Sequence, residues 1–375
     1  MDFNLRDHTI LLTLAGSRSY NTHTPSSDVD LKGIAVPPKS YYFGFLNRFE
    51  QADHPSHFEQ FLDLLTEEEL IAAKNTKCEG AVYELTKFIR LACDCNPSIL
   101  DALYCRSSDI RLITPLGQKL RDNRDLFLSK KAKHTYAGYA FDQIKRIERH
   151  RRYLLSPPTH EPTRQEFGLL AVPIIPHNQM DALLAAIRKT IDGWELDLTD
   201  VQEATKIYVN EQIERYLLDM NLFGPENAFI AAARKVGCDD NLVEVLVKER
   251  KYKVAHDEYR KYLNWQKNRN QERAELEAKY GYDLKHATHC VRLIRQGKEI
   301  LTTGKVNVFR EDAAELLEVK GGKFTYEEIT EYLYKEEKEL DELYKTCTIL
   351  PHSPDRVKLD QLCQEILEEF FADHK

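Results

Sequence analysis

One short stretch of the sequence, residues 14–34, combines residue types that could bind a phosphate and a metal ion. It runs LAGSRSYNTHTPSSDVDLKGI, with Gly16 and Ser17 near its start and Asp28 and Asp30 after a ten-residue spacer. Glycine lets the backbone approach a phosphate closely, and Ser17 adds a hydroxyl and a backbone N–H at the start of a helix. The two aspartates are two residues apart in an expected strand, so both carboxylates project from one face. Adjacent carboxylates repel unless a cation lies between them, and hard ions such as Mg²⁺ prefer oxygen ligands.

A phosphate-binding turn beside a pair of metal-binding carboxylates is suited to in-line phosphoryl or nucleotidyl transfer. A DxD motif alone carries little information, because it is common at turns and strand edges. The order found here is more restrictive: a buried strand, Gly-Ser, a spacer, and DVD at the start of a second strand. We therefore predict that a nucleoside triphosphate (NTP) binds here as substrate, with Mg²⁺ or Mn²⁺ as the cofactor.

Two predicted strands position these residues. Thr9–Ala15 is apolar and rich in β-branched residues and ends at Gly16, whereas Asp28–Val36 alternates in part and ends before a Pro-Pro pair. A third strand is predicted over Gly80–Leu85, directly before a helix with apolar residues at helical spacing over Thr86–Cys95. The pattern from about residue 115 onward is almost wholly helical.

These elements predict an α+β fold, in which a small mixed sheet with flanking helices is followed by a larger, mostly helical region. We expect three domains: a nucleotidyltransferase catalytic domain over residues 1–115, a helical region with an accessory insertion over 116–275, and a C-terminal helical domain over 276–375 that closes the NTP site. Ligand sites often lie where domains meet.

The motif resembles the signature of the DNA polymerase β-type nucleotidyltransferase superfamily, which is a hydrophobic residue, Gly-Ser or Gly-Gly, a spacer and an acid pair. The GSRSYNT stretch is similar to the GSRxxG variant of minimal nucleotidyltransferases, with Asn21 where that variant often has a second glycine. Asparagine tolerates a positive φ better than most residues. Blocks from about 10 to 106 and from about 275 to 355, such as YELTKFIRLACDCNPSILDALY and YGYDLKHATHCVRLIRQGKEIL, are similar to the RNA-repair-associated ("RNA-ligase-associated polymerase") subgroup, which has phage-type members.

The superfamily normally uses three carboxylates, so the resemblance implies a third acid, either Glu84 or Glu79. If the third strand is antiparallel to the second, its end returns to the edge that carries Asp28 and Asp30. Glu84 lies at that end, whereas Glu79 lies about 16 Å away at roughly 3.3 Å per residue. We predict Glu84 as the third catalytic and metal-binding carboxylate, with Glu79 as the alternative. The competing interpretation of Glu84 is an acidic residue favoured at a helix N-terminus.

A basic cluster lies on the helix predicted over Tyr282–Gln296. Three of its residues share one broad face of the helix, because they lie at positions i, i+3 and i+6. They are His286, His289 and Arg292. In polymerase β-like enzymes a helical domain often supplies basic side chains to the triphosphate, so the resemblance implies nucleotide contacts here. The alternatives are a solvated cationic face or a zinc site, but the H-x2-H spacing lacks further ligands at zinc spacing. The predicted nucleotide-binding set is Gly16, Ser17, Arg18, Lys32, Lys285, His286, His289 and Arg292.

The overall charge limits the class of partner. With 53 Lys+Arg against 61 Asp+Glu, the net charge of −8 argues against a general nucleic-acid coat protein, although not against an enzyme with one basic surface. Six of the eight residues in Lys145–Arg152 are basic, which is typical of either a phosphate-backbone contact or a solvated face. The eight cysteines include no CxxC pair, and no apolar run reaches the roughly 18–20 residues of a membrane helix. We expect a soluble cytoplasmic protein with reduced thiols.

The resemblance to RNA-repair proteins implies that an RNA or tRNA 3′ end accepts the nucleotide and that pyrophosphate leaves. Two other hypotheses remain. One is transfer of the nucleotide to a protein side chain, as by a toxin-like enzyme. The other is a non-catalytic module that binds a nucleotide or RNA, because a fold alone does not fix a function.

Overall fold

In the computed structural model the chain forms two compact units. The first combines residues 1–150 with 276–375, and the second comprises 151–275. The predicted α+β class is confirmed: a small mixed sheet with flanking helices lies at the N-terminus, and a mostly helical region follows. No helix in the described part of the chain is both long and apolar enough to cross a membrane. The structure describes residues 3–173, 175–192, 225–269 and 271–373.

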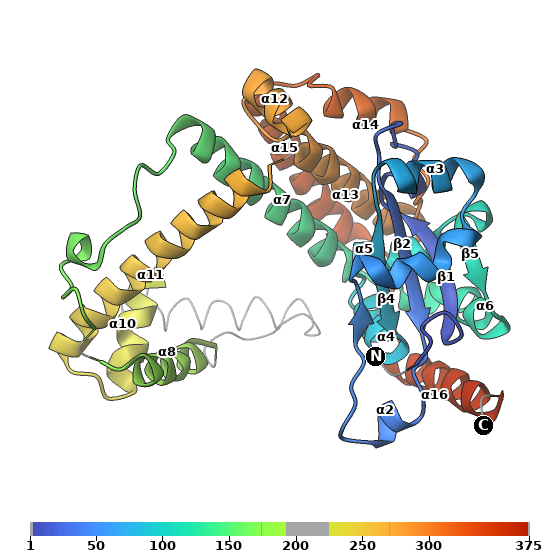
Figure 1. The fold of residues 1–375 in the computed structure, drawn as a ribbon, viewed down its shortest axis with the longest axis horizontal. Helices are drawn as coiled ribbons and strands as arrows, with labels where there is room; N and C mark the ends of the chain where they lie inside the picture. Colours follow the sequence, from blue (N-terminus) through green and yellow to red (C-terminus); the bar gives the residue numbers. More distant parts are fainter. Residues whose placement is uncertain (1–2, 174, 193–224, 270, 374–375) are drawn as a thin grey trace. The chain divides into compact units, whose positions relative to one another are not determined.

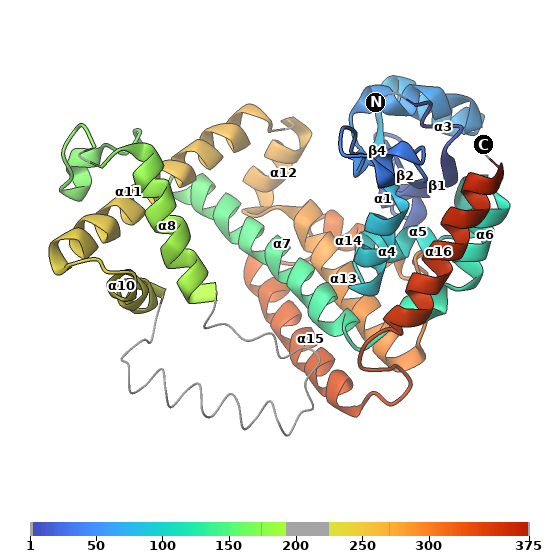
Figure 2. The same ribbon diagram turned by 90° about the horizontal axis from the view of Figure 1, so that it is seen from below.

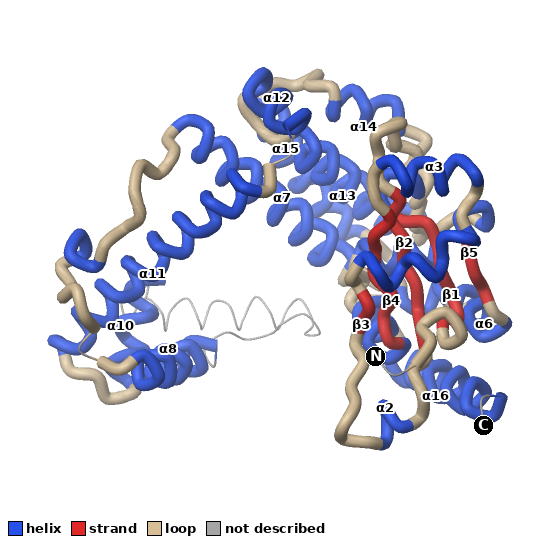
Figure 3. Tube along the Cα trace, in the orientation of Figure 1, coloured by secondary structure: helices blue, strands red, loops and turns tan. Residues whose placement is uncertain are grey.

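Five strands of the first unit form one sheet in the order β3-β4-β2-β1-β5 (Figures 1 and 3). The central strand β2 is antiparallel to β1 and parallel to β4, and β1 is also antiparallel to β5. The long connection from β2 to β4 permits this parallel pairing, because a parallel neighbour needs a crossover. The strands are β1 Thr9–Ala15, β2 Val29–Ala35, β3 Gln51–Ala52, β4 Cys78–Glu84 and β5 Ile110–Ile113.

Helices cover both faces of the sheet. On one face, α4, α5, α6 and α16 pack together, and the helices α4, α6 and α16 lie side by side in Figure 2. The other face is covered by α3 and a 3₁₀ segment over Pro55–Leu64, which bury Phe58 and Phe61. The helices of this unit are α1 Gly16–Ser19, α2 Ser40–Phe43, α3 Glu67–Asn75, α4 Leu85–Cys93, α5 Pro97–Tyr104, α6 Pro115–Asp122, α13 Leu284–Thr303, α14 Ala313–Lys320, α15 Tyr326–Thr346 and α16 Arg356–Asp373. Two further helices, α7 Ala132–Leu155 and α12 Gln271–Tyr280, extend across the boundaries between the units.

The alternation along β2 explains how one strand serves both the core and a polar site. Val29 and Leu31 are fully buried in the core beneath α3. Asp30 and Lys32 alternate with them, so their side chains project from the opposite face, toward α4 and α5. The core therefore fixes the register, since a slip by one residue would bury both charges.

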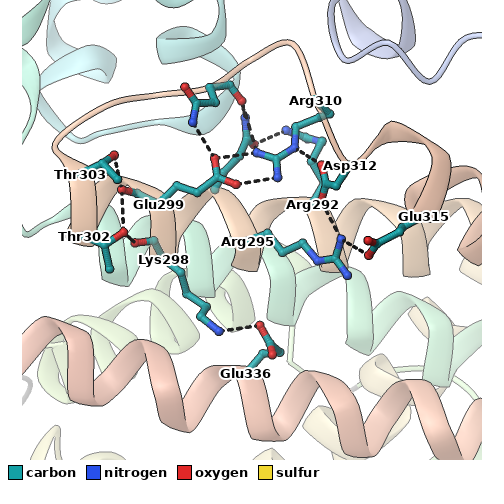
Figure 4. Close-up of polar contacts among 12 residues, drawn as sticks. Arg292, Arg295, Lys298, Glu299, Thr302, Thr303, Arg310, Asp312, Glu315 and Glu336 are labelled. Carbon is teal, nitrogen blue, oxygen red and sulfur yellow. Dashed lines mark hydrogen bonds and ion pairs between the residues drawn. The ribbon is translucent and has the colours of Figure 1, made fainter.

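A network of ion pairs holds α13 against its neighbours (Figure 4). Arg310 is buried, forms two hydrogen bonds of 2.8 and 2.6 Å with the Glu299 carboxylate and bonds Asp312 at 2.8 Å. Arg295 reaches Asp312 at 2.6 Å, and Lys298 reaches Glu336 on α15 at 2.9 Å. Because each carboxylate of Glu299 and Asp312 meets at least one guanidinium, the C-terminal half of α13 is rigidly positioned.

The second unit is helical and has a small core of its own. Ile187, Phe229 and Leu246 are buried together, and Arg164 pairs with Glu249. The predicted accessory segment falls mainly here, and its residues 193–224 lie outside the described residues. The helices are α8 His177–Asp192, α10 Pro225–Lys235 and α11 Asp240–Lys267.

Candidate active site

Two strands, β2 and β4, bring three acidic residues together at one end of the sheet, next to the end of β1. In the β1–β2 pairing Ala15 lies opposite Asp30, and in the parallel β2–β4 pairing Asp30 lies opposite Glu79. Residues directly paired across parallel strands project to the same face, so the carboxylates of Asp30 and Glu79 are neighbours. Asp28 immediately precedes β2, two residues before Asp30 and therefore on the same face. We refer to Asp28, Asp30 and Glu79 as the acidic trio.

The prediction that Glu84 joins Asp28 and Asp30 rested on an antiparallel third strand, and that strand direction is wrong. In the parallel pairing Glu84 lies opposite Ala35, at the far end of β2. There its carboxylate caps α4, accepting hydrogen bonds from the backbone N–H groups of Thr86 and Lys87 at 2.8 Å each, and it accepts a third from the Tyr42 hydroxyl at 2.6 Å. Glu84 thus has the competing role of a helix-capping residue, and the alternative acid, Glu79, lies beside Asp30.

The three carboxylates of the acidic trio lie close enough to affect one another's ionisation. Burial raises the pKa of Asp30 above its ordinary value, and the nearby charges of Glu79 and Asp28 raise it further. One exposed lysine offsets this in part, because Lys77 Nζ lies 2.7 Å from Glu79 and 3.7 Å from Asp28. The hydrogen bond to Glu79 raises the pKa of Lys77. The sequence interpretation missed this lysine, which precedes β4 and carried no motif.

This chemistry suits a hard divalent cation. The donors are all carboxylate oxygens, which Mg²⁺ and Mn²⁺ prefer. The ligating oxygens of Asp28, Asp30 and Glu79 do not all lie within 4.8 Å of one another. Lys77 is about half exposed and can turn into solvent, which would free both of its carboxylate partners for a metal ion.

Gly16 is required for the close approach between the turn after β1 and Asp30. Its φ is +62°, and a Cβ at this position would overlap the Oδ2 atom of Asp30. Both the backbone conformation and the lack of space exclude a larger residue. The turn and the acidic trio are therefore in direct contact, as the motif spacing predicted.

The rest of the GSRSYNT turn is held by its own backbone and by two polar side chains. Asn21 has a φ of +61°, which confirms the expectation that it replaces a glycine in the left-handed region. The backbone carbonyl of Ser17 accepts from Thr22 N–H at 2.9 Å. Arg18 is buried and pairs with Glu68 at 3.5 Å, and the Asn21 amide contacts the Arg310 carbonyl at 3.5 Å.

Lys32 and Arg292, both predicted nucleotide ligands, meet on the buried side of the trio. Lys32 donates to the Ser98 hydroxyl, and burial lowers the pKa of its ammonium group. Arg292 stacks 3.8 Å above the Tyr20 ring and lies 3.7 Å from Asp101, which accepts a 2.7 Å hydrogen bond from the Tyr20 hydroxyl. The structure thus brings both cations together around Asp101, a residue that the sequence interpretation did not select.

Buried polar atoms without a hydrogen-bond partner remain in this cluster. They are Asp101 Oδ1, Arg292 Nε and the hydroxyl of Tyr136. Orphaned buried polar atoms are costly in a folded protein and occur most often where a ligand or water completes the network. The cluster lies behind Asp30, whose charge acts on both Tyr20 and Lys32.

The remaining basic residues of α13 separate into two groups. Lys285 is exposed, and its charge lies close enough to lower the pKa of Asp30. His286 instead turns toward Asp283, with 3.5 Å between Nε2 and Oδ2, and His289 is half-buried one turn further on. Asp283 caps α13 by accepting from His286 N–H at 3.1 Å.

The basic run Lys145–Arg152 is partly used within the protein. His150 Nδ1 lies 3.2 Å from Asp283, and Arg152 pairs with Glu258 at 2.9 Å in the second unit. Lys145 and Arg146 are exposed. The two interpretations of this run, a phosphate-backbone contact or a solvated face, both remain predictions.

Comparison with known proteins agrees with the class that the motif indicated. Residues 4–157 match the model of the RNA repair pathway DNA polymerase beta family, so the resemblance is confirmed over this part of the chain. This match supports a nucleotidyltransferase-type role in RNA repair.

One curated relative extends the similarity beyond the sheet. Over 340 residues the chain is 26% identical to an uncharacterized 38.9 kDa protein from the nrdC–mobD intergenic region of Enterobacteria phage T4, covering 87% of this chain and 86% of the phage protein. No solved structure matches the chain significantly.

Proposed function

We propose that the protein is a Mg²⁺-dependent nucleotidyltransferase that moves a nucleoside monophosphate from an NTP to an acceptor hydroxyl at an RNA or tRNA 3′ end. The observation that carries this proposal is the acidic trio beside Gly16. Burial and two neighbouring carboxylates raise the pKa of Asp30, as expected of a site designed around a cation. The phosphate-binding turn of the motif is in contact with that carboxylate.

Asp28, Asp30 and Glu79 are the residues that would hold the metal. Bound Mg²⁺ would supply positive charge to the triphosphate and lower the pKa of the attacking hydroxyl. The turn at Gly16 and Ser17 would orient the β- and γ-phosphates through backbone N–H groups. Lys285 is exposed near Asp30 and is free to contact the leaving pyrophosphate.

The buried cations would position the nucleotide rather than take part in proton transfer. Arg292 is held by Tyr20, Asp101 and a 2.6 Å hydrogen bond to Gln296, so its guanidinium has a fixed orientation. Lys32 shares the face of Asp30 and balances part of its charge. An RNA 3′ end is favoured as acceptor by the match to a family of the RNA repair pathway.

The test is to incubate the purified protein with each α-labelled NTP and Mg²⁺, together with total RNA or with a protein extract. Label that moves to RNA 3′ ends supports the proposal, and the base that transfers identifies the NTP. Label on protein would replace the acceptor by a side chain. A double variant, Asp28→Asn with Asp30→Asn, is the blank, and equal labelling by this variant or no labelling at all contradicts nucleotidyl transfer.

A further inference from the structure

A second group of metal-ligating side chains lies outside the acidic trio, where α7 meets the start of α13. His150 comes from α7, and Asp283 and His286 come from the N-cap and first turn of α13. Figures 1 and 2 show these two helices side by side, and the Cys290 thiol donates to the Ala140 carbonyl at 3.3 Å between them. Ligands 133 residues apart in sequence form no spacing motif, which is why the H-x2-H pattern alone did not indicate this site.

The ligand atoms lie at the separations expected around a tetrahedrally coordinated metal ion. His150 Nδ1 lies 3.2 Å from Asp283 Oδ2, and His286 Nε2 lies 3.5 Å from the same oxygen. Within the described ranges, these three residues form a group whose ligating atoms all lie within 4.8 Å of one another. Zinc bonds of about 2.0–2.2 Å in a tetrahedron place neighbouring ligand atoms about 3.3–3.6 Å apart.

Hydrogen bonds alone account for these distances less well. A carboxylate that accepts from a charged imidazole N–H does so at about 2.7–2.9 Å. Both N···O separations here are longer than that, and 3.5 Å lies beyond an ordinary N–H···O bond. The 3.2 Å contact of His150 is still within the range of a hydrogen bond, so it is the 3.5 Å separation at His286, together with the oxygen that both imidazoles face, that fits atoms arranged around a shared centre.

The surroundings of the group also suit a metal. Asp283 is fully buried, and its second oxygen, Oδ1, accepts the His286 backbone N–H at 3.1 Å, which orients Oδ2 toward the two imidazoles. Hydrogen bonds of this kind fix ligand carboxylates at metal sites. The side chains of His150 and His286 are 17% and 14% exposed, so one side of the group is accessible to an incoming ion and to water.

We propose that His150, Asp283 and His286 bind one divalent transition-metal ion, with Zn²⁺ as the best fit. Two imidazole nitrogens and one carboxylate oxygen favour Zn²⁺ over Mg²⁺, and they leave a fourth tetrahedral position for water. The ion ties α7 to the first turn of α13, from which Lys285 extends. The site is separate from the acidic trio and its metal.

The test measures metal bound to the full-length protein. Protein stripped with a chelator is given one equivalent of Zn²⁺, passed over a chelating resin and analysed for zinc by mass spectrometry. We expect close to one retained ion in the wild type. His150→Ala and His286→Ala each remove a ligand and should weaken zinc binding by more than about 100-fold, the upper end of the cost of losing only a supporting residue.

Two controls separate this site from others. His134→Ala removes an exposed histidine from the same helix, and Asp30→Asn alters the acidic trio, so both should retain the zinc. Cobalt(II) titrated into the stripped wild type needs no variant, and an intense visible d–d spectrum would report tetrahedral coordination even if a histidine variant failed to fold. No retained zinc in the wild type, or equal zinc in His150→Ala, His286→Ala and wild type, would overturn the proposal in favour of a hydrogen-bonded His-Asp-His cluster.

Discussion

Two aspartates of the first unit, Asp30 and Asp312, are both partly buried but have opposite electrostatics. For both residues burial is the largest influence and raises the pKa. At Asp312, hydrogen bonds from Arg310 and Arg295 outweigh burial and lower the pKa below its ordinary value. At Asp30, two further carboxylates add to the effect of burial, and the pKa stays raised.

Asp312 is a structural acid whose charge the chain itself neutralises, whereas Asp30 is an acid suited to binding an added cation. The network around Asp312 pairs each acid with a guanidinium from the chain itself (Figure 4). The acidic trio has three carboxylates, with Lys77 beside two of them and the charges of Lys32 and Lys285 near Asp30, yet the pKa of Asp30 stays raised. A folded protein tolerates an acid with such a raised pKa at functional sites, where a ligand can supply further positive charge.

The largest expected effect is on activity at Asp30. Asp30→Asn should lower nucleotidyl transfer by more than about 10³-fold, because metal ligation supplies several kcal/mol of charge stabilisation in the transition state. In metal-free buffer the same variant should be at least as stable as the wild type, since it removes a repelled charge. Transfer of labelled NMP and urea unfolding measure the two effects.

Asp312→Asn is the matched variant in the ion-pair network around α13. It should lower stability and leave nucleotidyl transfer unchanged. Losing the charge that Arg310 and Arg295 share lowers stability, while the chemistry at the trio is untouched. A folded Asp30→Asn protein with wild-type transfer would remove the distinction between the two acids.

The next effect separates the two glutamates of β4. Glu79→Gln should lower transfer by about 10²-fold or more, because Glu79 lies beside Asp30 and contributes a ligand. Glu84→Gln should leave transfer nearly unchanged and lower the free energy of unfolding by about 1 kcal/mol through a weakened helix cap. Initial rates and urea midpoints on both variants decide the matter. If Glu84→Gln abolished transfer and Glu79→Gln did not, the parallel pairing of β2 with β4 would not describe the active site.

A smaller effect, on stability, is expected at Arg310. Arg310→Met should lower the free energy of unfolding by about 3 kcal/mol, since it leaves Glu299 and part of Asp312 without the buried guanidinium. Lys358→Met, which breaks the exposed pair with Asp355, is the control and should change stability little. Equal urea midpoints for these two variants would show that the network around α13 contributes nothing beyond a surface pair.

The smallest effect is a pH dependence of opposite sign at the two aspartates. A raised folded pKa means that Asp30 contributes stability below the ordinary Asp pKa of about 3.9 and that this contribution is lost as the pH rises through the folded value. A lowered folded pKa means that Asp312 contributes stability above about 3.9 and that this is lost as the pH falls.

Urea midpoints of the metal-free wild type and each Asn variant, from about pH 3.5 to about pH 7, test these signs. Relative to the wild type, Asp30→Asn should become more stable as the pH rises, whereas Asp312→Asn should become less stable. Added Mg²⁺ should abolish the trend at Asp30 alone. Parallel profiles for the two variants would show that the trio is already neutralised by the chain.

Local patterns predicted most of the elements around the site. The strand Thr9–Ala15 has the predicted bounds, and β2 differs from its prediction by one residue at each end. Apolar runs, glycine and proline determine such segments locally. Asn21 was also predictable, because few residues other than glycine accept its positive φ.

What the sequence did not reveal depends on contacts between distant segments. The direction of β4 is set by a long crossover that contains α3 and the two-residue strand β3, and this strand has too few residues to show a pattern. Without that direction, Glu84 was chosen over Glu79. The roles of Lys77 and Asp101 likewise follow only from the packed structure.

The parallel pairing of β2 with β4 also has a consequence for how the protein folds. Asp30 and Glu79 become neighbours only when the whole crossover between their strands has closed, whereas β1 and β2 can pair through a short connection. Contacts between residues far apart in sequence form late, because the entropy of closing the loop is lost before the contacts form. A refolding chain should therefore gain its β1–β2 pair before it gains affinity for Mg²⁺, so metal binding reports on completion of the sheet.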